Sequence, residues 1–436
     1  MKPIPHEKTA DSTFALLQDG YTFIAKRCAQ LQSDVFETRL MLRKAICVAG
    51  EDASEMFFQP GRFTRVKALP PNALALLQDF GSVQLLDNEA HHWRKRMFMS
   101  LMTPERLQQL TAILKERWLA RVNKLVDMGE VVLQLEAERL LCGAVCQWAG
   151  VTLTEAAVRQ RADEFAAMID GAGAVGPRHW RGMLLRRHTE VWVRSIIEGV
   201  RAGHMSVPED CPIHVVAWHR DKHGQLLDAK VAGVELINLL RPTVAVARYV
   251  TFAALAMHHY PECTEKLQGR DEEYLGWFVQ EVRRFYPFFP LVGGRVLEEF
   301  DWRGTHFAKG TWVLLDLYGT NHDPRIWGDP ESFRPERFRS WKPSPFNFIP
   351  QGGGDFEHGH RCAGEWLTIE VMKTAVRLLV SAMEYDVPQQ DLRIDLTRMP
   401  AIPASRFILS HVRRRPSRTD ISGVYRSHNN AAHPAW

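Results

Sequence analysis

A helical spacing of apolar residues dominates the middle of this chain, from about residue 90 to residue 257. Apolar side chains recur there every three or four residues, for example over 106–125 and 191–202, as they do on the buried face of a helix. Strand-like patterns are short and lie mostly outside this region. We expect strands over 21–26, 40–47, 291–297, 312–317 and 407–412. The sequence therefore predicts a mainly α protein with small peripheral β-sheets.

The length of the chain is sufficient for one large domain. It has 436 residues, of which 45% are hydrophobic, and can bury a sizeable core. We expect residues 1–412 to form a single domain. Residues 413–436, rich in Arg, Ser, Asn, His and Pro, carry no core-facing pattern and are expected to form a mobile tail. A long irregular connection is expected over 324–350, which is rich in Pro, Arg and aromatic residues.

Charge, cysteine content and hydropathy bear on the binding partners and on the cellular compartment of the protein. Lys and Arg number 55 against 51 Asp and Glu, and the positive residues are scattered apart from the run 413–415, so we expect no nucleic-acid partner. Seven cysteines are an odd number, and residues 1–6 lack the apolar core of a signal peptide, which together predict a reduced, cytoplasmic protein. The most apolar stretch, 244–257, contains Arg248 and is too short for a membrane span, so we expect a buried core helix.

A glycine-rich loop over 346–365 presents a single cysteine, Cys362, and then enters an apolar helix. The first turn of that helix would supply unpaired N–H groups and the positive end of the dipole, which stabilise a thiolate. A thiolate placed in this way suits the axial ligand of a haem iron, where its electron density favours cleavage of an O–O bond. Two other interpretations stay open: a small buried hydrophobe, or a zinc cluster with His358 and His360, for which no fourth ligand follows at the usual spacing.

Two further motifs place this loop in a wider pattern. Glu281 and Arg284 lie three residues apart on one predicted helix face, where they can pair. Arg337, in the sequence Pro-Glu-Arg-Phe, offers a second cation to the same carboxylate. An E-x-x-R helix, a P-E-R-F turn and a Gly-rich Cys loop in this order resemble the cytochrome P-450 family, over roughly residues 18–412. The resemblance implies the cytochrome P-450 fold, with haem b between a central and a proximal helix and Cys362 as its iron ligand.

A basic helix face is the candidate site for the haem propionates. Asp87, His91 and Lys95 follow one another at four-residue intervals and so share one face of a helix. The family uses a D-x-x-x-H-x-x-x-R pattern for this purpose, and Lys95 preserves the cation that a propionate needs. The resemblance adds Arg65 as a further candidate. Without the cysteine loop, this stretch would be read as an ordinary solvated basic helix.

The expected central helix departs from the usual pattern of the family, in which an acid and a threonine relay protons to bound dioxygen. Residues 239–243 read L-L-R-P-T here. Arg241 replaces the carboxylate, and Pro242 removes a helix hydrogen bond to the Asn238 carbonyl and should kink the helix. We therefore expect the ordinary proton relay to be disabled.

Arg241 itself points to an anionic substrate. An arginine among Leu, Pro and Val needs an anion, since leaving a buried charge unpaired costs about 3 to 5 kcal/mol. Glu235 is six residues back and is expected on another face of the helix. We expect a fatty-acid carboxylate to bind the planar fork of Arg241 and then to act as general acid and base toward hydrogen peroxide. The alternative is a structural pairing of Arg241 with a distant acid.

The Arg-Pro pair, together with E-V-R-R-F-Y-P-F-F-P and F-I-P-Q-G-G-G-D, resembles the fatty-acid peroxygenase branch of the family. This resemblance implies a peroxide-dependent oxidoreductase that needs no redox partner. The cysteine loop agrees, because Asp355, His358 and His360 stand where Phe, Gly and Arg are usual, which puts docking of an electron donor in doubt. Two other functions stay open: a conventional monooxygenase fed by a reductase, and a haem-binding sensor without turnover.

One position of the early helix region bears on the product. Members of the branch that form alkenes by decarboxylation tend to carry His where this chain has Gln84, and Gln cannot donate a full proton at neutral pH as His can. The resemblance therefore implies mainly 2-hydroxy acids, some 3-hydroxy acids and little alkene. Ile169, Phe288, Phe289 and Leu291 are expected to line the tunnel for the alkyl chain, although the last three fit a plain core equally well.

Overall fold

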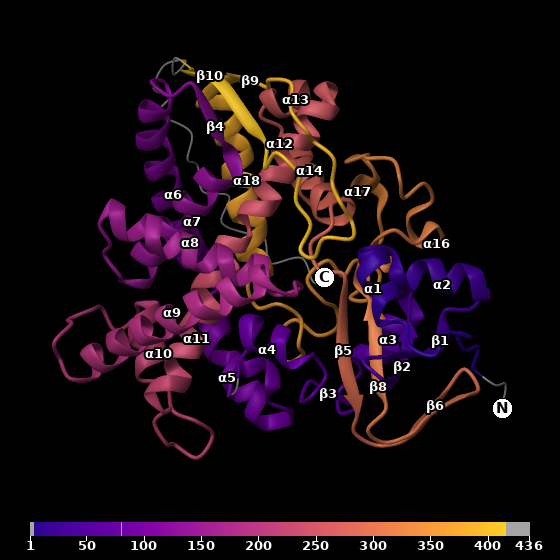
Figure 1. Cartoon of the computed structure of the whole chain (residues 1–436). Coiled ribbons are helices and arrows are strands. Elements are labelled where there is room, and N and C mark those ends of the chain that lie inside the picture. The colour runs from indigo at the N-terminus through magenta and orange to yellow at the C-terminus, as the bar shows by residue number, and fades with distance from the viewer. Residues whose placement is uncertain (1–3, 80, 416–436) are drawn as a thin grey trace.

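The computed structural model of the protein describes residues 4–79 and 81–415. It combines a large helical body with a smaller region built on a five-stranded sheet (Figure 1). The helices are α1 (Thr13–Asp19), α2 (Phe23–Leu31), α3 (Glu51–Phe58), α4 (Pro71–Leu77), α5 (Asn88–Ser100), α6 (Pro104–Leu125), α7 (Leu133–Ala149), α8 (Glu155–Gly171), α9 (Pro177–Arg201), α10 (Pro212–Ala217), α11 (Ala229–Ala245), α12 (Ala247–His259), α13 (Pro261–Gln268), α14 (Glu272–Phe285), α15 (Leu317–Asn321), α16 (Pro324–Trp327), α17 (Arg337–Ser340) and α18 (Glu365–Ser381), with 3-10 turns η1 (Gly20–Thr22) and η2 (Val83–Leu85). The strands are β1 (Val35–Leu40), β2 (Arg43–Val48), β3 (Phe63–Thr64), β4 (Glu130–Val132), β5 (Leu291–Val296), β6 (Phe300–Trp302), β7 (Thr305–Phe307), β8 (Trp312–Asp316), β9 (Met383–Asp386) and β10 (Ile408–Arg414). The predicted fold class, mainly α with small sheets, is confirmed.

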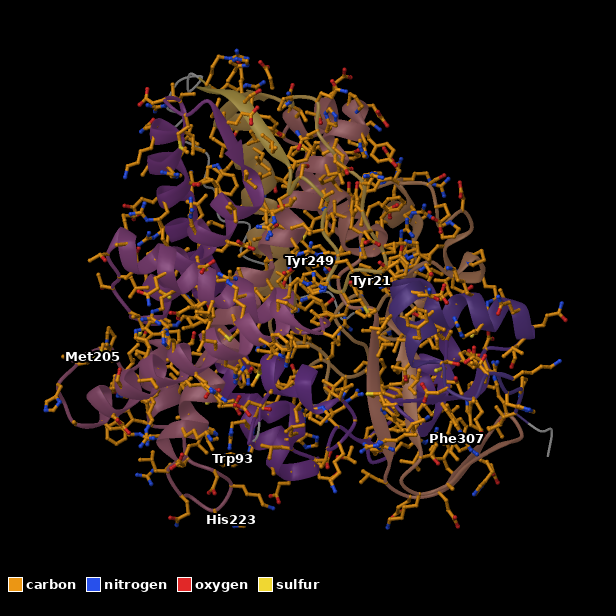
Figure 2. The ribbon with its side chains drawn as sticks, in the orientation of Figure 1. Tyr21, Trp93, Met205, His223, Tyr249 and Phe307 are labelled. Carbon is orange, nitrogen blue, oxygen red and sulfur yellow. The ribbon has the colours of Figure 1, made fainter. Side chains whose placement is uncertain are left out.

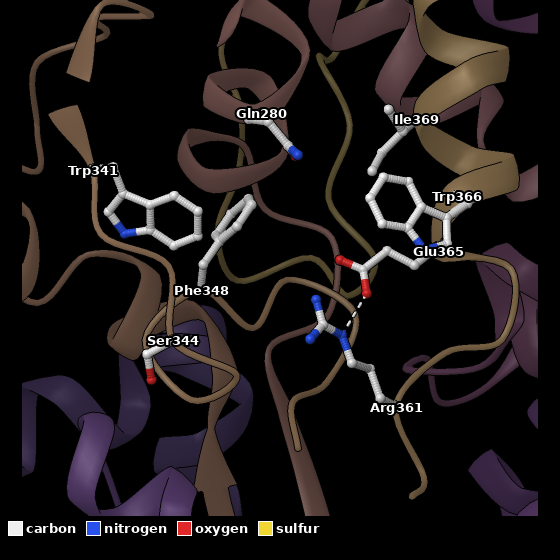
Figure 3. Close-up of a pocket in the computed structure, with 8 residues that line it drawn as sticks. All are labelled: Gln280, Trp341, Ser344, Phe348, Arg361, Glu365, Trp366 and Ile369. Carbon is white, nitrogen blue, oxygen red and sulfur yellow. Dashed lines mark hydrogen bonds and ion pairs between the residues drawn. The ribbon is translucent and has the colours of Figure 1, made fainter. Parts of the chain in front are cut away.

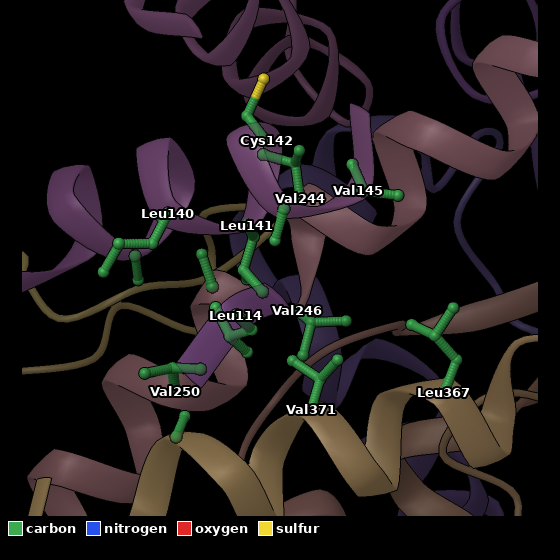
Figure 4. Packing of buried hydrophobic residues seen from close by; sticks show 14 of the residues in the cluster. Leu114, Leu140, Leu141, Cys142, Val145, Val244, Val246, Val250, Leu367 and Val371 are labelled. Atoms are coloured by element: carbon green, nitrogen blue, oxygen red, sulfur yellow. The ribbon is translucent and has the colours of Figure 1, made fainter. Parts of the chain in front are cut away.

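The helical body is organised around α7, α11, α12 and α18, which are buried along most of their length. Side chains from these helices and from α6 pack against one another, among them Leu114, Leu141, Val250 and Val371 (Figure 4). The stretch 229–259 is long and apolar enough to cross a membrane by length and composition alone, but 89% of its most apolar window is buried inside the protein. The predicted buried core helix over 244–257 corresponds to the end of α11 and most of α12, which are both buried. Helix α11 continues past Pro242 to Ala245, and only Val246 separates it from α12.

The five-stranded sheet has the order β1-β2-β8-β5-β3. Strand β2 pairs with β8 in parallel, whereas β1–β2, β5–β8 and β3–β5 are antiparallel. The sequence analysis located β5 and β8 within one residue at each end. Strand β5 begins at Leu291, just after Phe288 and Phe289. These two residues therefore lie in the connection between α14 of the helical body and the sheet.

Two expected strands near the N-terminus differ from the structure. Residues 21–26 lie in η1 and α2, because Phe23, Ile24 and Arg27 are buried at helical spacing. Residues 40–47 are not one strand but parts of the hairpin β1–β2, which turns at Met41 and Leu42 with positive φ angles of 51° and 60°. Because this turn contains Met and Leu in place of the usual Gly, Asn or Asp, no local pattern in the sequence indicates that the chain reverses here.

The C-terminal part of the described chain forms a second, smaller sheet of the order β4-β10-β9. Strand β10 extends to Arg414, so Arg413 and Arg414 are paired with β9. The remainder of the expected tail, 416–436, lies outside the described residues, as do residues 1–3. The connection 324–350 is irregular apart from the short helices α16 and α17.

Aromatic side chains join the helical body to the sheet region. Figure 2 labels Tyr249 and Tyr21 close to the middle of the molecule. Tyr21 donates its hydroxyl to the Phe288 carbonyl at 2.7 Å, and Tyr249 stacks on the Phe288 ring at 4.2 Å between centroids. These contacts fix the segment that leads into β5.

Candidate active site

Cys362 lies three residues before the start of α18, at the end of a tightly packed glycine-rich loop. A Cβ added to Gly353 would lie 2.6 Å from both the Ile349 side chain and the Pro345 carbonyl, so this part of the loop requires glycine. The Cys362 N–H donates to the Gln351 carbonyl at 3.3 Å, and the Gln351 side-chain amide lies 3.8 Å from the sulfur. Burial, followed by the charge of Glu365, raises the pKa of the Cys362 thiol. The thiolate therefore needs a positive partner such as a metal ion, which reverses this shift.

A buried ion-pair network lies beside this loop. Glu365 accepts hydrogen bonds from Arg283 Nη2 at 2.5 Å and from Arg361 Nε at 2.6 Å. Arg283 also donates to Gln351 Oε1 at 3.0 Å, which orients the amide that faces the sulfur of Cys362. Figure 3 shows Arg361 and Glu365 facing each other at a shallow recess. The lining residues are Gln280, Trp341, Ser344, Phe348, Arg361, Glu365, Trp366 and Ile369.

Glu281 brings together the two arginines that the sequence analysis assigned to it. Its fully buried carboxylate accepts from Arg284 Nε at 2.8 Å and Nη2 at 2.9 Å, and from Arg337 Nε at 3.0 Å. Arg337 also donates to the carbonyls of Trp327 and Ser332 at 2.7 Å. The network thus fastens the irregular connection 324–350 to α14, on the side of the molecule that presents Cys362.

Several basic side chains converge near the cysteine loop: Arg65, His91, Lys95 and His360. Burial lowers the pKa of Arg65 to about 10, that of Lys95 to about 8 and that of His91 to about 4. The His91 and His360 rings lie 4.0 Å apart between centroids. Within the described ranges, none of these four groups forms an ion pair with a carboxylate. Arg65 and Lys95 are thus buried cations without acids, and His91 and His360 are neutral imidazoles that can donate a hydrogen bond. Such a set suits a dianionic ligand, and together with a cysteine thiolate it fits the two propionates and the iron of haem b.

The structure adds detail to two of these basic residues. Lys95 Nζ donates to the carbonyls of Gly359 and Arg361, each at 2.6 Å, and so ties α5 to the cysteine loop. His360 was noted in the sequence as a departure from the usual arginine and as a candidate zinc ligand, but not as a residue of the haem site. As for the zinc interpretation, the part of the chain that is described contains no group of three or more His, Cys, Asp or Glu side chains placed to share a metal ion.

Helix α11 places Arg241 in the interior, where 5% of its surface is exposed. Its Nη1 donates to the Leu76 carbonyl at 2.8 Å. Among residues 4–79 and 81–415, no acidic side chain lies within ion-pair distance of it. Burial, followed by the nearby charge of Arg186, lowers the pKa of Arg241 to about 9, so the group is still a cation at neutral pH. Its remaining N–H donors are available for a carboxylate.

Glu235 lies on a different face of α11, as expected, and has partners of its own. It accepts from Arg94 Nη1 at 2.7 Å, from the Val83 N–H at 2.8 Å and from Asn238 Nδ2 at 3.2 Å. Asn238 also donates to Gln84 Oε1 at 3.4 Å. Glu235 and Asn238 therefore anchor η2, which carries Gln84, to the central helix. Sequence reasoning missed both roles, since their partners lie about 150 residues away.

The expected tunnel residues are less uniformly placed. Ile169 is buried on α8, and Phe288 is half-buried against Tyr249. Phe289 is 41% exposed, and Leu291 packs with the cluster on the sheet side of the molecule.

Comparisons with known sequences agree on one family. The cytochrome P-450 family model matches residues 255–410. Cytochrome P-450 4e5, mitochondrial, of Drosophila mettleri is 28% identical over 154 residues, which are 31% of this chain and 29% of the relative. Cytochrome P-450 4A7 of Oryctolagus cuniculus is 31% identical over 175 residues, 36% of this chain and 32% of the relative. The match spans about a third of these curated relatives.

Solved structures match over nearly the whole chain. Cytochrome P-450SP alpha (CYP152B1) in complex with (R)-ibuprofen has a TM-score of 0.90 and 47% identity, covering 93% of this chain and 99% of that one. Cytochrome P-450EX alpha (CYP152N1) with myristic acid has a TM-score of 0.91 and 42% identity, covering 95% and 100%. A variant of cytochrome P-450 OleT in complex with arachidonic acid has a TM-score of 0.92 and 33% identity, covering 96% and 100%.

Proposed function

Because the chain belongs to the cytochrome P-450 family, among its CYP152 fatty-acid peroxygenases, we propose that it hydroxylates medium- and long-chain fatty acids with hydrogen peroxide, mainly at carbon 2. Some attack at carbon 3 and minor decarboxylation to a terminal alkene accompany this reaction. In the main reaction one peroxide oxygen is inserted into a C–H bond next to the carboxyl group, and the other leaves as water. The balance requires neither NAD(P)H nor an electron-donor protein. The seven free cysteines suit a reducing cytoplasm.

The chain's own residues would hold haem b as follows. Cys362 would ligate the iron, Arg65 and Lys95 would provide the cations for the propionates, and His91 would donate a hydrogen bond to one of them. When bound, this group would supply the activation of hydrogen peroxide and the transfer of its oxygen. The Gln351 amide would contribute a hydrogen bond to the sulfur at the observed 3.8 Å.

The observation that carries the proposal is the buried, acid-free Arg241. A fatty-acid carboxylate that binds its guanidinium removes the cost of an unpaired buried charge, which is about 3 to 5 kcal/mol. Because the carboxylate is held at Arg241, carbon 2, the atom next to it, would be the part of the alkyl chain whose position is best fixed in the site. Pro242 lacks an N–H and therefore leaves the Asn238 carbonyl, on the turn before Arg241, without its helix hydrogen bond.

The bound carboxylate has a second task, because the usual acid of the central helix is replaced by Arg241. A carboxylate oxygen can take a proton from one peroxide oxygen and return it to the other, which then leaves as water. Asn238 donates to Gln84 Oε1, so the Gln84 NH2 group is free to donate a hydrogen bond but not a proton. Ile169 and Phe288 are proposed to contact the alkyl chain.

The deciding experiment mixes the purified haem-loaded protein with hydrogen peroxide and hexadecanoic acid in the absence of any reductase. Products are separated and identified by mass spectrometry. Formation of 2-hydroxyhexadecanoic acid as the main product supports the proposal. Product that forms only after a reductase, NAD(P)H and dioxygen are added contradicts it and identifies a monooxygenase.

A further inference from the structure

A second buried arginine lies directly behind Arg241. Arg186 on α9 is 2% exposed, and its Nη1 donates to the Leu76 carbonyl at 3.2 Å. The same oxygen accepts from Arg241 Nη1 at 2.8 Å. A carbonyl oxygen has two lone pairs, so these two donors account for its whole capacity. Helices α4, α9 and α11 therefore meet at one oxygen atom.

Arg186 is held in place by acids, whereas Arg241 is not. Its Nε donates to Glu190 Oε1 at 2.7 Å, and its Nη2 lies 3.2 Å from Asp79 Oδ2. Glu190 is one turn further along α9, and Asp79 follows the end of α4. Contacts at both ends of the planar guanidinium fix its direction. Because the group is rigid, each of these hydrogen bonds costs little further side-chain conformational entropy.

Leu76 is fixed from its other side as well. A Cβ added to Gly171 or Gly182 would lie 3.1 or 3.2 Å from Leu76 Cδ1, so α8 and α9 pack closely over this side chain. Leu76 is completely buried. Its side chain is thus confined by two glycines and its carbonyl by two arginines.

We propose that Arg186 is a positioning residue that fixes the direction of the Arg241 guanidinium and thereby the preference of the site for carboxylates over uncharged head groups. This inference rests on the proposed role of Arg241 in substrate binding. While Arg186 occupies one lone pair of the Leu76 oxygen, Arg241 can place only one N–H there. Its other donors then remain directed at the substrate, in the fork geometry that matches a carboxylate.

The charge of Arg186 acts in the same sense. Two buried cations that share one acceptor repel each other, and the arrival of a carboxylate at Arg241 relieves this repulsion. Asp79 and Glu190 offset part of the Arg186 charge, and no described acid does so for Arg241, so the carboxylate is expected to bind at Arg241 and not at Arg186. An uncharged alcohol head group gains little from either effect.

The test compares dodecanoic acid with 1-dodecanol, each titrated into the haem-loaded enzyme and followed by its change in haem absorption. For Arg186→Gln we expect the dissociation constant of the acid to rise about tenfold, since a charge-assisted hydrogen bond is disturbed, while that of the alcohol stays within about twofold. Arg186→Lys, which keeps the charge but not the fork, should lie between wild type and Arg186→Gln. Equal weakening of acid and alcohol would show a merely structural role and overturn the proposal, as would unchanged binding of the acid.

Two further variants make the result independent of folding and of the proposed function. Arg248→Gln removes another buried arginine, 4% exposed on α12, and should lower thermal stability without changing the ratio of the two dissociation constants. Glu190→Ala removes the acceptor of Arg186 Nε, together with the Glu190 contact to Asp79, and should shift the ratio by about twofold to threefold toward the alcohol. An unchanged ratio in this variant contradicts the proposal even if Arg186→Gln does not fold. Arg241→Gln tests the premise: if it retains the preference for the acid, the proposed function fails regardless of what Arg186 does.

Discussion

Asn238 and Gln84 are joined by a hydrogen bond from the Nδ2 of the first to the Oε1 of the second, at 3.4 Å. Asn238 lies three residues before Arg241 on α11, so the two side chains share one face of that helix. Gln84 is thereby tied to the helix face that carries Arg241, the residue proposed to bind the substrate, and its NH2 group can still donate. The type of group at position 84 should therefore influence the product.

Replacement of Gln84 by His is expected to raise the alkene fraction of the product. A histidine can deliver a proton near neutral pH, whereas the Gln84 amide cannot. The ratio of alkene to 2-hydroxy acid, measured by gas chromatography and mass spectrometry at equal conversion, should increase severalfold. Gln84→Asn, which keeps the amide but shortens the side chain, is the matched control and should not produce this increase. A ratio that is the same in all three proteins would mean that position 84 does not select the product.

Replacement of Arg241 by Ala should reduce peroxide-dependent turnover of fatty acids by about 100-fold or more, because a charge-assisted pair worth ~3 kcal/mol is lost. Haem content should stay close to that of the wild type, since among residues 4–79 and 81–415 the hydrogen bond of Arg241 goes to the Leu76 carbonyl and not to a residue assigned to the haem. Turnover and haem content are measured on the same preparation. Wild-type turnover in this variant would rule out the carboxylate mechanism.

Glu281→Gln should strongly destabilise the fold. The substitution leaves the buried guanidinium of Arg284 and the nearly buried one of Arg337 without a compensating charge, which costs about 3 to 5 kcal/mol. The free energy of unfolding is measured by urea denaturation. Glu336→Gln, which removes an exposed ion pair with Lys266, is the control and should change it by no more than about 0.5 kcal/mol. Similar small effects in both variants would contradict a structural role for the Glu281 network.

Asp316 should make stability fall as the pH rises from about 4 to about 7. Burial raises the pKa of this carboxyl from 3.8 to about 7 in the folded protein, so in this window the folded state holds a proton that the unfolded state has lost. The unfolding free energy should therefore decrease by up to about 1.4 kcal/mol per pH unit from this group. Above pH 7 the group is ionised in both states and its contribution is constant. The slope between pH 5 and 7 should be less negative in Asp316→Asn, and equal slopes would contradict the assignment.

The parts of the fold that sequence predicted are those in which local spacing and burial agree. The core stretch 244–257 carries a long apolar pattern of a helix, and the strands β5 and β8 are short runs bounded by turn residues. In residues 21–26 spacing and burial disagree, because their aromatic alternation resembles a strand while the burial of Phe23, Ile24 and Arg27 follows a helix. The hairpin at Met41 and Leu42 lacks turn residues and depends on contacts with the side chains of Thr13 and Asp11.

The candidate site divides in a similar way. The absence of an acid one turn from Arg241 is a local property, and it was visible in the sequence. The identity of the groups that do approach is not local: Glu235 binds Arg94, 141 residues away, and the Leu76 carbonyl is 165 residues from Arg241. A main-chain oxygen leaves no compositional signal at all, so its part in holding Arg241 could not have been predicted.

That oxygen has a consequence for how such a site changes over evolutionary time. Any residue at position 76 presents the same carbonyl as long as the backbone of α4 keeps its path, so point mutations at that codon cannot delete the contact with Arg241. Substitutions at position 76 itself would therefore leave the proposed recognition of the head group unchanged. Selection for a new head group must act instead through the side chains at 186 and 241, or through the course of α4.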